Sequence, residues 1–277
     1  MFSKPLDLTL RTFAQRNFST ERAVPPRAVE FTNSAIETLL LSSSTKAFGS
    51  FFREMDGDAR FETAVDPGKR RLDGPLIPAA GLFVKRIMDL LVSSVALVLL
   101  WPFLFVIALV IKLESPGPVI YASWRAGKRG KKFACYKFRT MVDGADELKD
   151  SLRRFNERGD PFFKIADDPR VTRVGRFLRK YSLDELPQFW NALKGDMSLV
   201  GPRPHPLDDY ARYRSEDHRR LEVKPGITGL WQVTARVDPS FETCMVLDLG
   251  YMKHWSPWLD CKILMRTIPA VLAGEGS

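Results

Sequence analysis

The sequence predicts a membrane-associated chain of mixed helices and strands, in which one hydrophobic helix enters the bilayer and returns to the same side. Three observations lead to this prediction. Residues 90–111 carry no charge, a proline lies near the middle of that run, and basic residues flank both of its ends. Basic flanks favour the cytoplasmic side of a membrane. We therefore expect a re-entrant membrane helix followed by a small cytoplasmic domain.

Residues 1–80 are predicted to form a poorly ordered N-terminal extension. Their first residues lack the apolar core of a secretory signal peptide. Short helices are expected only at 34–41 and 47–54, and residues 66–81 mix Pro, Gly and charge in the manner of a linker.

Charge and cysteine content narrow the class of protein. Almost all of the formal net charge of +9 lies after residue 80, which favours anionic partners such as phosphorylated substrates, nucleic acid or acidic lipid. The three cysteines lack CxxC spacing, so the sequence predicts neither a disulfide framework nor a zinc site.

Pro102 decides how the hydrophobic run is interpreted. As one straight helix, residues 90–111 would reach ~33 Å, close to the ~30 Å of bilayer hydrocarbon, so a single transmembrane span is the alternative on length alone. Proline removes a helix hydrogen bond and bends the chain. The two legs beside it would be only ~18 Å and ~14 Å long, too short to cross singly. We expect residues 81–113 to form a re-entrant helix broken at Pro102.

The next segment predicts a turn and two strands. Residues 115–118, Ser-Pro-Gly-Pro, form a rigid turn, and residues 119–124 and 133–141 have the composition of short strands. The basic, glycine-bearing loop between them, residues 125–133, suits either phosphate or a lipid surface, and both interpretations stay open.

Two adjacent carboxylates, Asp184 and Glu185, precede a helical run that ends at Gly195. Ser182 and Glu185 match a capping box, in which case the acids only start a helix. Pro187 fits better as the third helical residue, which makes Asp184 the N-cap and should depress the pKa of its carboxyl. An ionised carboxylate there could cap the helix, hold a metal or attack phosphorus, and the pattern leaves these roles open.

Arg203 stands between two prolines in the stretch Gly-Pro-Arg-Pro, residues 201–204. The prolines restrict the backbone, and the guanidinium is a fork-shaped donor suited to phosphate oxygens. A structural turn would need the prolines but not the arginine. Arg203 therefore favours a chemical role for the nearby carboxylates.

Two amphipathic helices are expected in the same domain. Residues 170–181 combine apolar positions at helical spacing with arginines, which predicts a basic amphipathic helix. Residues 259–272 carry an apolar stripe behind Trp255 and Trp258. That stripe fits a membrane-interface helix and a core-facing helix equally well.

Several blocks, taken together, resemble the bacterial sugar transferase family, the monotopic phosphoglycosyl transferases. The resemblance covers roughly residues 82–275 and rests on KRIMDLL, ESPGPVIY, KFRTM, DPRVTRVGRFLRKYSLDELPQFWNALKGDMSLVGPRP, KPGITGLWQV and SPWLDCKIL. It implies an α/β fold with a re-entrant membrane helix, a small α/β cytoplasmic catalytic domain at 114–277 and interfacial amphipathic helices. It also implies location at the bacterial inner (cytoplasmic) membrane, with the catalytic domain on the cytoplasmic face.

The resemblance implies transfer of a sugar-1-phosphate from a UDP-sugar to polyprenyl (undecaprenyl) phosphate, with release of UMP, in exopolysaccharide or lipopolysaccharide biosynthesis. Carried over, Asp184 is the nucleophile and forms a phosphosugar-aspartyl intermediate. Mg²⁺ beside Asp184 and Glu185 would offset diphosphate charge, and Glu185 would assist in metal binding or proton handling. Membrane lipid is a further expected partner, nucleic acid is not, and homo-oligomerisation is left open.

The resemblance also suggests which residues hold the substrates. The expected phosphate-binding residues are Arg203, Arg179, Lys137 and Arg139. The expected nucleotide- or sugar-binding residues are Trp231, Gln232, Arg236 and Asp248. The stretch TGLWQV, residues 228–233, is more similar to members that transfer glucose- or galactose-1-phosphate than to those that transfer N-acetylated sugars.

Two other classes stay as alternatives. A non-enzymatic membrane-bound binding module would show no turnover and strongly salt-dependent binding. An aspartyl phosphohydrolase would pass the phosphoryl group to water, so a requirement for lipid phosphate separates it from the transferase.

Overall fold

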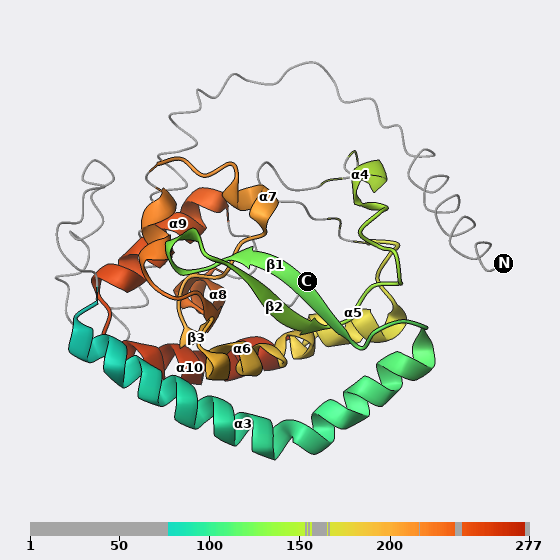
Figure 1. Cartoon of the computed structure of the whole chain (residues 1–277), viewed down its shortest axis with the longest axis horizontal. Helices are drawn as coiled ribbons and strands as arrows, with labels where there is room; N and C mark the ends of the chain where they lie inside the picture. Colours follow the sequence, from blue (N-terminus) through green and yellow to red (C-terminus); the bar gives the residue numbers. More distant parts are fainter. Residues whose placement is uncertain are drawn as a thin grey trace.

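The computed structural model describes residues 77–274, except for residues 153, 155, 157–164, 166, 216 and 236–239. The short helices expected at 34–41 and 47–54, and most of the linker expected at 66–81, lie outside the described residues. Within this part of the chain, one long helix lies along a body of short helices and two small sheets (Figure 1). The body comprises the described residues from 115 onward.

The long helix, α3 (Ala79–Glu114), has Pro102 in its interior. Figure 1 shows that α3 bends near its middle. The helix is continuous where a break at Pro102 was expected, because one missing hydrogen bond bends a helix without ending it. Its apolar side chains are largely exposed, with Leu99 at 72% and Leu113 at 77%. It is long and apolar enough to cross a membrane.

Lys85 fixes the first leg of α3 to the body. Its ammonium lies 2.6 Å from Oδ2 of Asp260 in α10 (Pro257–Leu272) and donates to the Tyr251 hydroxyl of α9 (Phe241–Lys253) at 2.9 Å. It also donates to the carbonyl of Val200 at 3.0 Å. Lys85 is one of the basic residues that precede the hydrophobic run, and the structure buries it as a docking contact.

Arg86 and Asp89 continue this docking contact. Arg86 donates to the carbonyls of Ala192 and Leu193, in the last turn of α6 (Gln188–Lys194), at 2.7 and 2.8 Å. Carbonyls in the last turn of a helix carry partial negative charge, so a cation is favoured there. The buried Asp89 carboxylate accepts the backbone N–H of Leu199 at 2.8 Å.

The second leg of α3 docks through apolar contacts. Ile107 and Ile111 are buried against Phe138 and against Leu178 of α5 (Arg173–Lys180). Both legs of the long helix therefore pack on the same body, and Figure 1 shows α6, α10 and α5 along its inner side.

The two strands expected after the long helix are confirmed. β1 (Ile120–Ala126) pairs antiparallel with β2 (Lys132–Phe138), with Ile120 opposite Phe138. The basic loop is shorter than expected because its ends extend the strands. The short 3₁₀ helix η2 (Lys128–Gly130) forms the turn, where Arg129 adopts a φ of 56°.

The second sheet lies at the centre of the body. β3 (Ser198–Val200) pairs parallel with β4 (Gly226–Thr228). A Cβ on Gly226 would lie 2.1 Å from the backbone nitrogen of Gly201, so this approach requires glycine. The sheet contacts α3, α6 and α10, and its buried side chains share one core with those of α8 (Leu230–Thr234) and α9. The buried apolar residues of this core are Ile77, Leu199, Val200, Val223, Leu230, Leu247, Tyr251, Met252, Leu259 and Ile263.

The amphipathic helices are both present, with different bounds. α5 begins after Thr172, whose hydroxyl accepts the Gly175 N–H at 2.9 Å. In α10 the expected stripe divides: Leu259 and Ile263 are buried in the core, Val271 is half-buried, and Ile268 and Leu272 are exposed. The body also contains the short elements α4 (Lys149–Leu152), α7 (Leu207–Tyr210) and the 3₁₀ helices η4 (Leu183–Glu185) and η5 (Asp217–Glu222).

Candidate active site

A cavity of about 1120 Å³ lies between the β1–β2 sheet, the start of α6, α8 and α10. One part of its wall is charged and another is apolar. The charged lining includes Arg125, Lys137, Arg139, Arg179, Asp184, Glu185 and Arg203. The apolar lining includes Val92 of α3, Phe189, Leu199, Ile227, and Leu264, Ile268, Val271 and Leu272 of α10.

The carboxylate pair sits in a 3₁₀ turn, η4 (Leu183–Glu185), that leads into α6. Asp184 is therefore not the N-cap of α6, which was the expected register. Pro187 is the N-cap of α6. It has helical φ and ψ and no side-chain cap, because the preceding 3₁₀ turn is already helical and continues directly into α6. The predicted stop is confirmed: Gly195 ends α6 with a φ of 95°, in the left-handed region that glycine favours.

Glu185 lies between two cations. Its Oε1 accepts from the Lys137 ammonium at 2.6 Å and from Arg203 Nη2 at 2.5 Å, and its Oε2 accepts from Arg203 Nη1 at 3.1 Å. Burial opposes ionisation of this carboxyl, but Arg203 and Lys137 outweigh it and hold its pKa well below the usual range. Glu185 thus carries a stable negative charge that fixes both cations.

Asp184 is held differently from its neighbour. Its carboxylate is 7% exposed and lies 3.7 Å from the Lys137 ammonium, and no described residue donates it a hydrogen bond. Burial raises the pKa of Asp184, and the charge of Glu185 adds to this rise. A depressed pKa was expected from an N-cap position; it is wrong because the residue is buried in a 3₁₀ turn. The result is an acidic group with oxygens available to a ligand.

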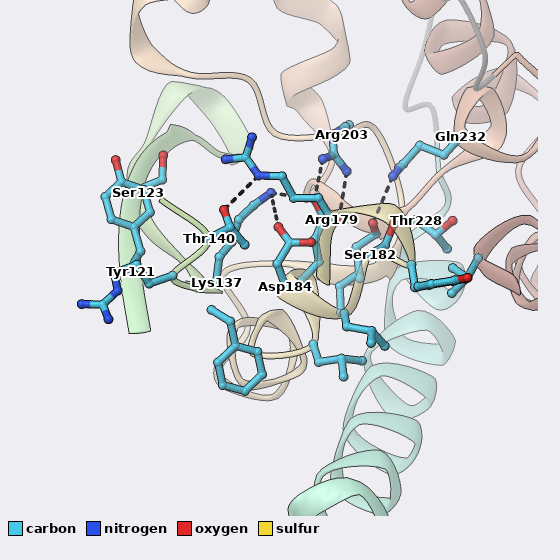
Figure 2. Close-up of a pocket in the computed structure, with 18 of the residues that line it drawn as sticks. Tyr121, Ser123, Lys137, Thr140, Arg179, Ser182, Asp184, Arg203, Thr228 and Gln232 are labelled. Carbon is cyan, nitrogen blue, oxygen red and sulfur yellow. Dashed lines mark hydrogen bonds and ion pairs between the residues drawn. The ribbon is translucent and has the colours of Figure 1, made fainter. Parts of the chain in front are cut away.

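Arg179 completes a group of three cations around Asp184. Its Nε donates to the Thr140 hydroxyl at 2.9 Å, which directs the guanidinium into the cavity. Figure 2 shows the charged ends of Lys137, Arg179 and Arg203 gathered on one side of Asp184. The structure therefore brings together Asp184, Glu185 and three of the four residues expected to bind phosphate.

Arg139, the fourth, is engaged elsewhere. Its guanidinium donates to the carbonyls of Ser115 and Pro116 at 2.8 and 2.6 Å and to the Ser115 hydroxyl at 2.9 Å. It lines the cavity, but its donors hold the turn that follows α3. Gly117 permits this contact, because it has a φ of 111° and its Cβ would lie 2.2 Å from Arg139 Nη1.

The expected nucleotide- or sugar-binding residues separate into three groups. Trp231 and Gln232 line the cavity. Asp248, contrary to expectation, does not line it: the carboxylate is 1% exposed and pairs with the buried Arg220. Asp248 lies on the buried face of α9, so its carboxylate points into the core and does not reach the cavity. Arg236 lies outside the described residues.

Sequence reasoning missed Arg125 and Thr140 as parts of this site. Tyr121, Ser123 and Arg125 alternate along β1 and all line the cavity, on the face that also carries Lys137 of β2. The period of two was visible in the sequence. Choosing the face required the pairing register, which only the folded sheet supplies.

The donor set fits a single Mg²⁺ held mainly by substrate. No group of three metal-binding side chains occurs among the described residues. Mg²⁺ commonly takes one or two carboxylates and completes its shell with phosphate oxygens and water. Asp184 can supply such an oxygen, whereas both oxygens of Glu185 already accept from cations. The metal role expected for Glu185 therefore has less support than that of Asp184.

The chain matches a known family over most of its described length. The family described as bacterial sugar transferase matches residues 80–274. The chain is 42% identical over 213 residues to the undecaprenyl-phosphate galactose phosphotransferase of Salmonella typhimurium, covering 75% of this chain and 44% of that protein. It is 41% identical over 219 residues to the UDP-glucose:undecaprenyl-phosphate glucose-1-phosphate transferase of Caulobacter vibrioides, covering 75% and 76%.

A third relative is the exopolysaccharide production protein ExoY of Rhizobium meliloti, 42% identical over 208 residues, which cover 74% of this chain and 92% of that protein. The matched part spans less than half the length of other relatives, such as the galactosyl transferase CpsE of Streptococcus agalactiae at 44%. The match extends from the start of α3 to the end of α10 and includes the whole cavity. The chain belongs to the bacterial sugar transferase family.

Proposed function

We propose that the protein transfers a hexose-1-phosphate from a UDP-sugar to undecaprenyl phosphate and releases UMP. The observation that carries the proposal is the buried Asp184 carboxylate, open to a ligand, beside Lys137, Arg179 and Arg203. A phosphoryl group in transfer has charge spread over its oxygens, and preorganised cations stabilise that charge.

The cavity also suits an acceptor with a phosphate head and an apolar chain. Its charged wall surrounds Asp184, and its apolar wall is built from α10 and includes Val92 of α3. A lipid phosphate entering from the membrane side would meet apolar side chains first and cations at the end. An acceptor without a lipid chain would leave the apolar wall without a partner.

The reaction proceeds through two displacements at one phosphorus. An Asp184 oxygen attacks the β-phosphorus of the UDP-sugar while the bond to the bridging oxygen breaks, and that oxygen leaves on UMP. A phosphate oxygen of the acceptor then attacks the same phosphorus and displaces Asp184, which is restored as a carboxylate. Arg203 and Lys137, fixed by Glu185, and Arg179, held by Thr140, bind the phosphate oxygens in both steps.

Mg²⁺, held by Asp184 and the substrate, would offset charge on the diphosphate. Glucose and galactose are the hexoses to test first, because they appear in the names of two relatives.

The test is UMP release by the full chain in lipid nanodiscs with Mg²⁺. The donors are UDP-glucose, UDP-galactose and UDP-N-acetylglucosamine, each with and without undecaprenyl phosphate. We expect lipid-dependent release with a hexose donor, and its loss in Asp184→Asn. Asp196→Asn is the matched control, since Asp196 lies outside the cavity and pairs with Lys194 on the surface.

A second measurement tests the intermediate. With donor labelled in the sugar and no acceptor, the label should stay covalently on the wild-type protein and be absent from Asp184→Asn. Release of free sugar phosphate without lipid would instead support a phosphohydrolase. No turnover with any donor, beside an active transferase in the same assay, would refute the proposed function.

We also propose that α3 is re-entrant, with both ends on the cytoplasmic face. Both of its legs pack on one body: the first through Lys85 and Arg86, the second through Ile107 and Ile111. A straight transmembrane span would place one of these contacts across the bilayer from the other.

Cysteine labelling tests this topology in a variant without the three native cysteines. Ala80→Cys reports the first end of α3, and Lys131→Cys reports the body; both positions are exposed. Neither should react with an impermeant maleimide in intact spheroplasts, and both should react after lysis. Labelling of Ala80→Cys in intact spheroplasts would establish a single span.

A further inference from the structure

The backbone around Arg203 is held by hydrogen bonds to the carbonyls of Pro202, Arg203 and His205. The Pro202 carbonyl accepts from the Gly226 N–H at 2.9 Å, and the His205 carbonyl accepts from the Ala126 N–H at 3.2 Å. The carbonyl of Arg203 accepts from a side chain instead. Pro204 confines the ψ angle of Arg203, the residue before it, to extended values. Within that range, the hydrogen bond that the Arg203 carbonyl accepts selects the direction of the carbonyl.

The donor to that carbonyl is Arg220, in η5. Its Nη2 lies 2.7 Å from the Arg203 oxygen, and its Nε and Nη2 lie 3.0 and 2.5 Å from Oδ2 of Asp248. The third nitrogen, Nη1, donates to the Tyr213 hydroxyl at 2.5 Å. Arg220 is 2% exposed and Asp248 is 1% exposed, so the pair is enclosed by protein.

Tyr213 connects the same cluster to a second residue of the segment. Its hydroxyl accepts from Arg220 and lies 2.7 Å from Nδ1 of His205. Burial raises the pKa of Tyr213 to about 12, so the phenol keeps its proton at neutral pH. Arg220 therefore holds the segment at two points, directly at Arg203 and through Tyr213 at His205.

We propose that Arg220 is a positioning residue for sugar-phosphate transfer: it fixes the carbonyl of Arg203, and Asp248 fixes Arg220. The inference rests on the proposed function, in which Arg203 binds phosphate. The Arg203 guanidinium must meet both oxygens of Glu185 and still face the reacting phosphorus. A rotation of its carbonyl turns the whole side chain away from that direction. Asp248, expected to bind nucleotide or sugar, thus acts from the core through Arg220 and Arg203.

The test is a double-mutant cycle between Arg220 and Arg203. Arg220→Lys keeps a cation for Asp248, but one ammonium cannot reach Tyr213 and the Arg203 carbonyl as the fork does. We expect kcat/KM to fall about 10- to 100-fold, as for small misplacements of a binding group. In the Arg203→Lys background the same change should cost less than about 3-fold, because contacting sites are not additive.

Arg170→Lys is the matched control. Arg170 is also buried and forked onto an aspartate, Asp168, and its Nη1 donates to the Ala145 carbonyl at 3.1 Å, whereas Arg220 donates to Arg203. Its effect should multiply with that of Arg203→Lys. A purely structural role for Arg220 predicts the same multiplication, with equal losses in both backgrounds, and that result would overturn the proposal.

Two further measurements separate loss of positioning from the cost of an unpaired buried charge. The pair Arg220→Met with Asp248→Leu removes both buried charges together, which a core tolerates better than one unpaired charge. This double variant should lower kcat/KM as Arg220→Lys does. When it is introduced into the Arg203→Lys background, it should cause little further loss. Within residues 201–206 only Gly201, Arg203 and His205 carry a backbone N–H. Hydrogen–deuterium exchange at these three amides should quicken in Arg220→Lys but not in Arg170→Lys.

The exchange measurement does not need turnover. If the wild type uses no UDP-sugar, the proposed function fails, and unchanged exchange in Arg220→Lys then overturns the anchoring role as well. If the wild type is active and exchange is unchanged, only the anchoring role fails.

Discussion

Replacing Lys85 by Met should loosen the first leg of α3 from the body. The change removes an ion pair of 2.6 Å to Asp260 and the donors to Tyr251 and Val200 at 2.9 and 3.0 Å. Breaking a buried pair on one side costs about 3–5 kcal/mol. Asp260 keeps hydrogen bonds from Tyr251 and Trp255 at 2.7 and 3.1 Å, so we expect the lower end, about 3 kcal/mol.

The assay is thermal unfolding of the full chain in one fixed detergent. For a chain of this size, about 3 kcal/mol corresponds to a fall in Tm of about 6–12 °C. Lys112→Met is the control on the same helix, because Lys112 is exposed and donates only to the Gly117 carbonyl at 3.1 Å among the described residues. Its effect should stay within about 0.5 kcal/mol.

Adding Asp260→Leu to Lys85→Met should restore part of the lost stability, since it removes the carboxylate left without its cation. Equal Tm values for Lys85→Met and Lys112→Met would refute the docking role of Lys85. A further loss in the double variant would show that Asp260 does not depend on Lys85.

Three further predictions follow from single contacts. Burial lowers the pKa of His205 well below 6.5, so below that pH the unfolded chain binds a proton that the folded chain does not. The free energy of unfolding of the wild type should therefore fall by about 1.4 kcal/mol per pH unit below about 6.5 from this group. This slope should be absent in His205→Asn and present in the exposed control His218→Gln. Gly175→Ala should lower Tm and transfer activity, because its Cβ would lie 2.1 Å from the Thr140 carbonyl oxygen, and an unchanged Tm would contradict this contact. Asn191→Asp should destabilise the chain by about 1–3 kcal/mol, because a carboxylate cannot donate to the Ala134 carbonyl of β2, which accepts from the Asn191 amide at 2.7 Å. Denaturant unfolding measures the loss, and an unchanged midpoint would contradict the role of that bond.

Features encoded within a short stretch of chain were predicted well. The strands of the first sheet, the α5 and α10 helices and the stop at Gly195 follow from local periodicity or from glycine's access to positive φ. The register before α6 was wrong, because a capping box and a 3₁₀ turn share the same residue types. A proline that suits the first helical turn also suits the N-cap position that it takes.

Charge assignments depended on contacts between distant parts of the chain. Lys85 looked like a residue beside a membrane and proved to be the partner of Asp260, 175 positions away. Arg139 looked like a phosphate ligand and holds the turn after α3. In each case the residue type was informative, but its partner was not visible in the sequence.

The sequence by itself determined the long apolar helix, the local elements and the choice of Asp184, Glu185 and Arg203 as candidate site residues. Those signals are short-range, since they rest on composition, period and the chemistry of single side chains. The tertiary structure decided which cations surround Asp184, which way its pKa shifts, and that Asp248 serves Arg220 in the core. The physical reason is that ion pairing and burial are properties of neighbours in space, and these neighbours come from segments far apart in the chain.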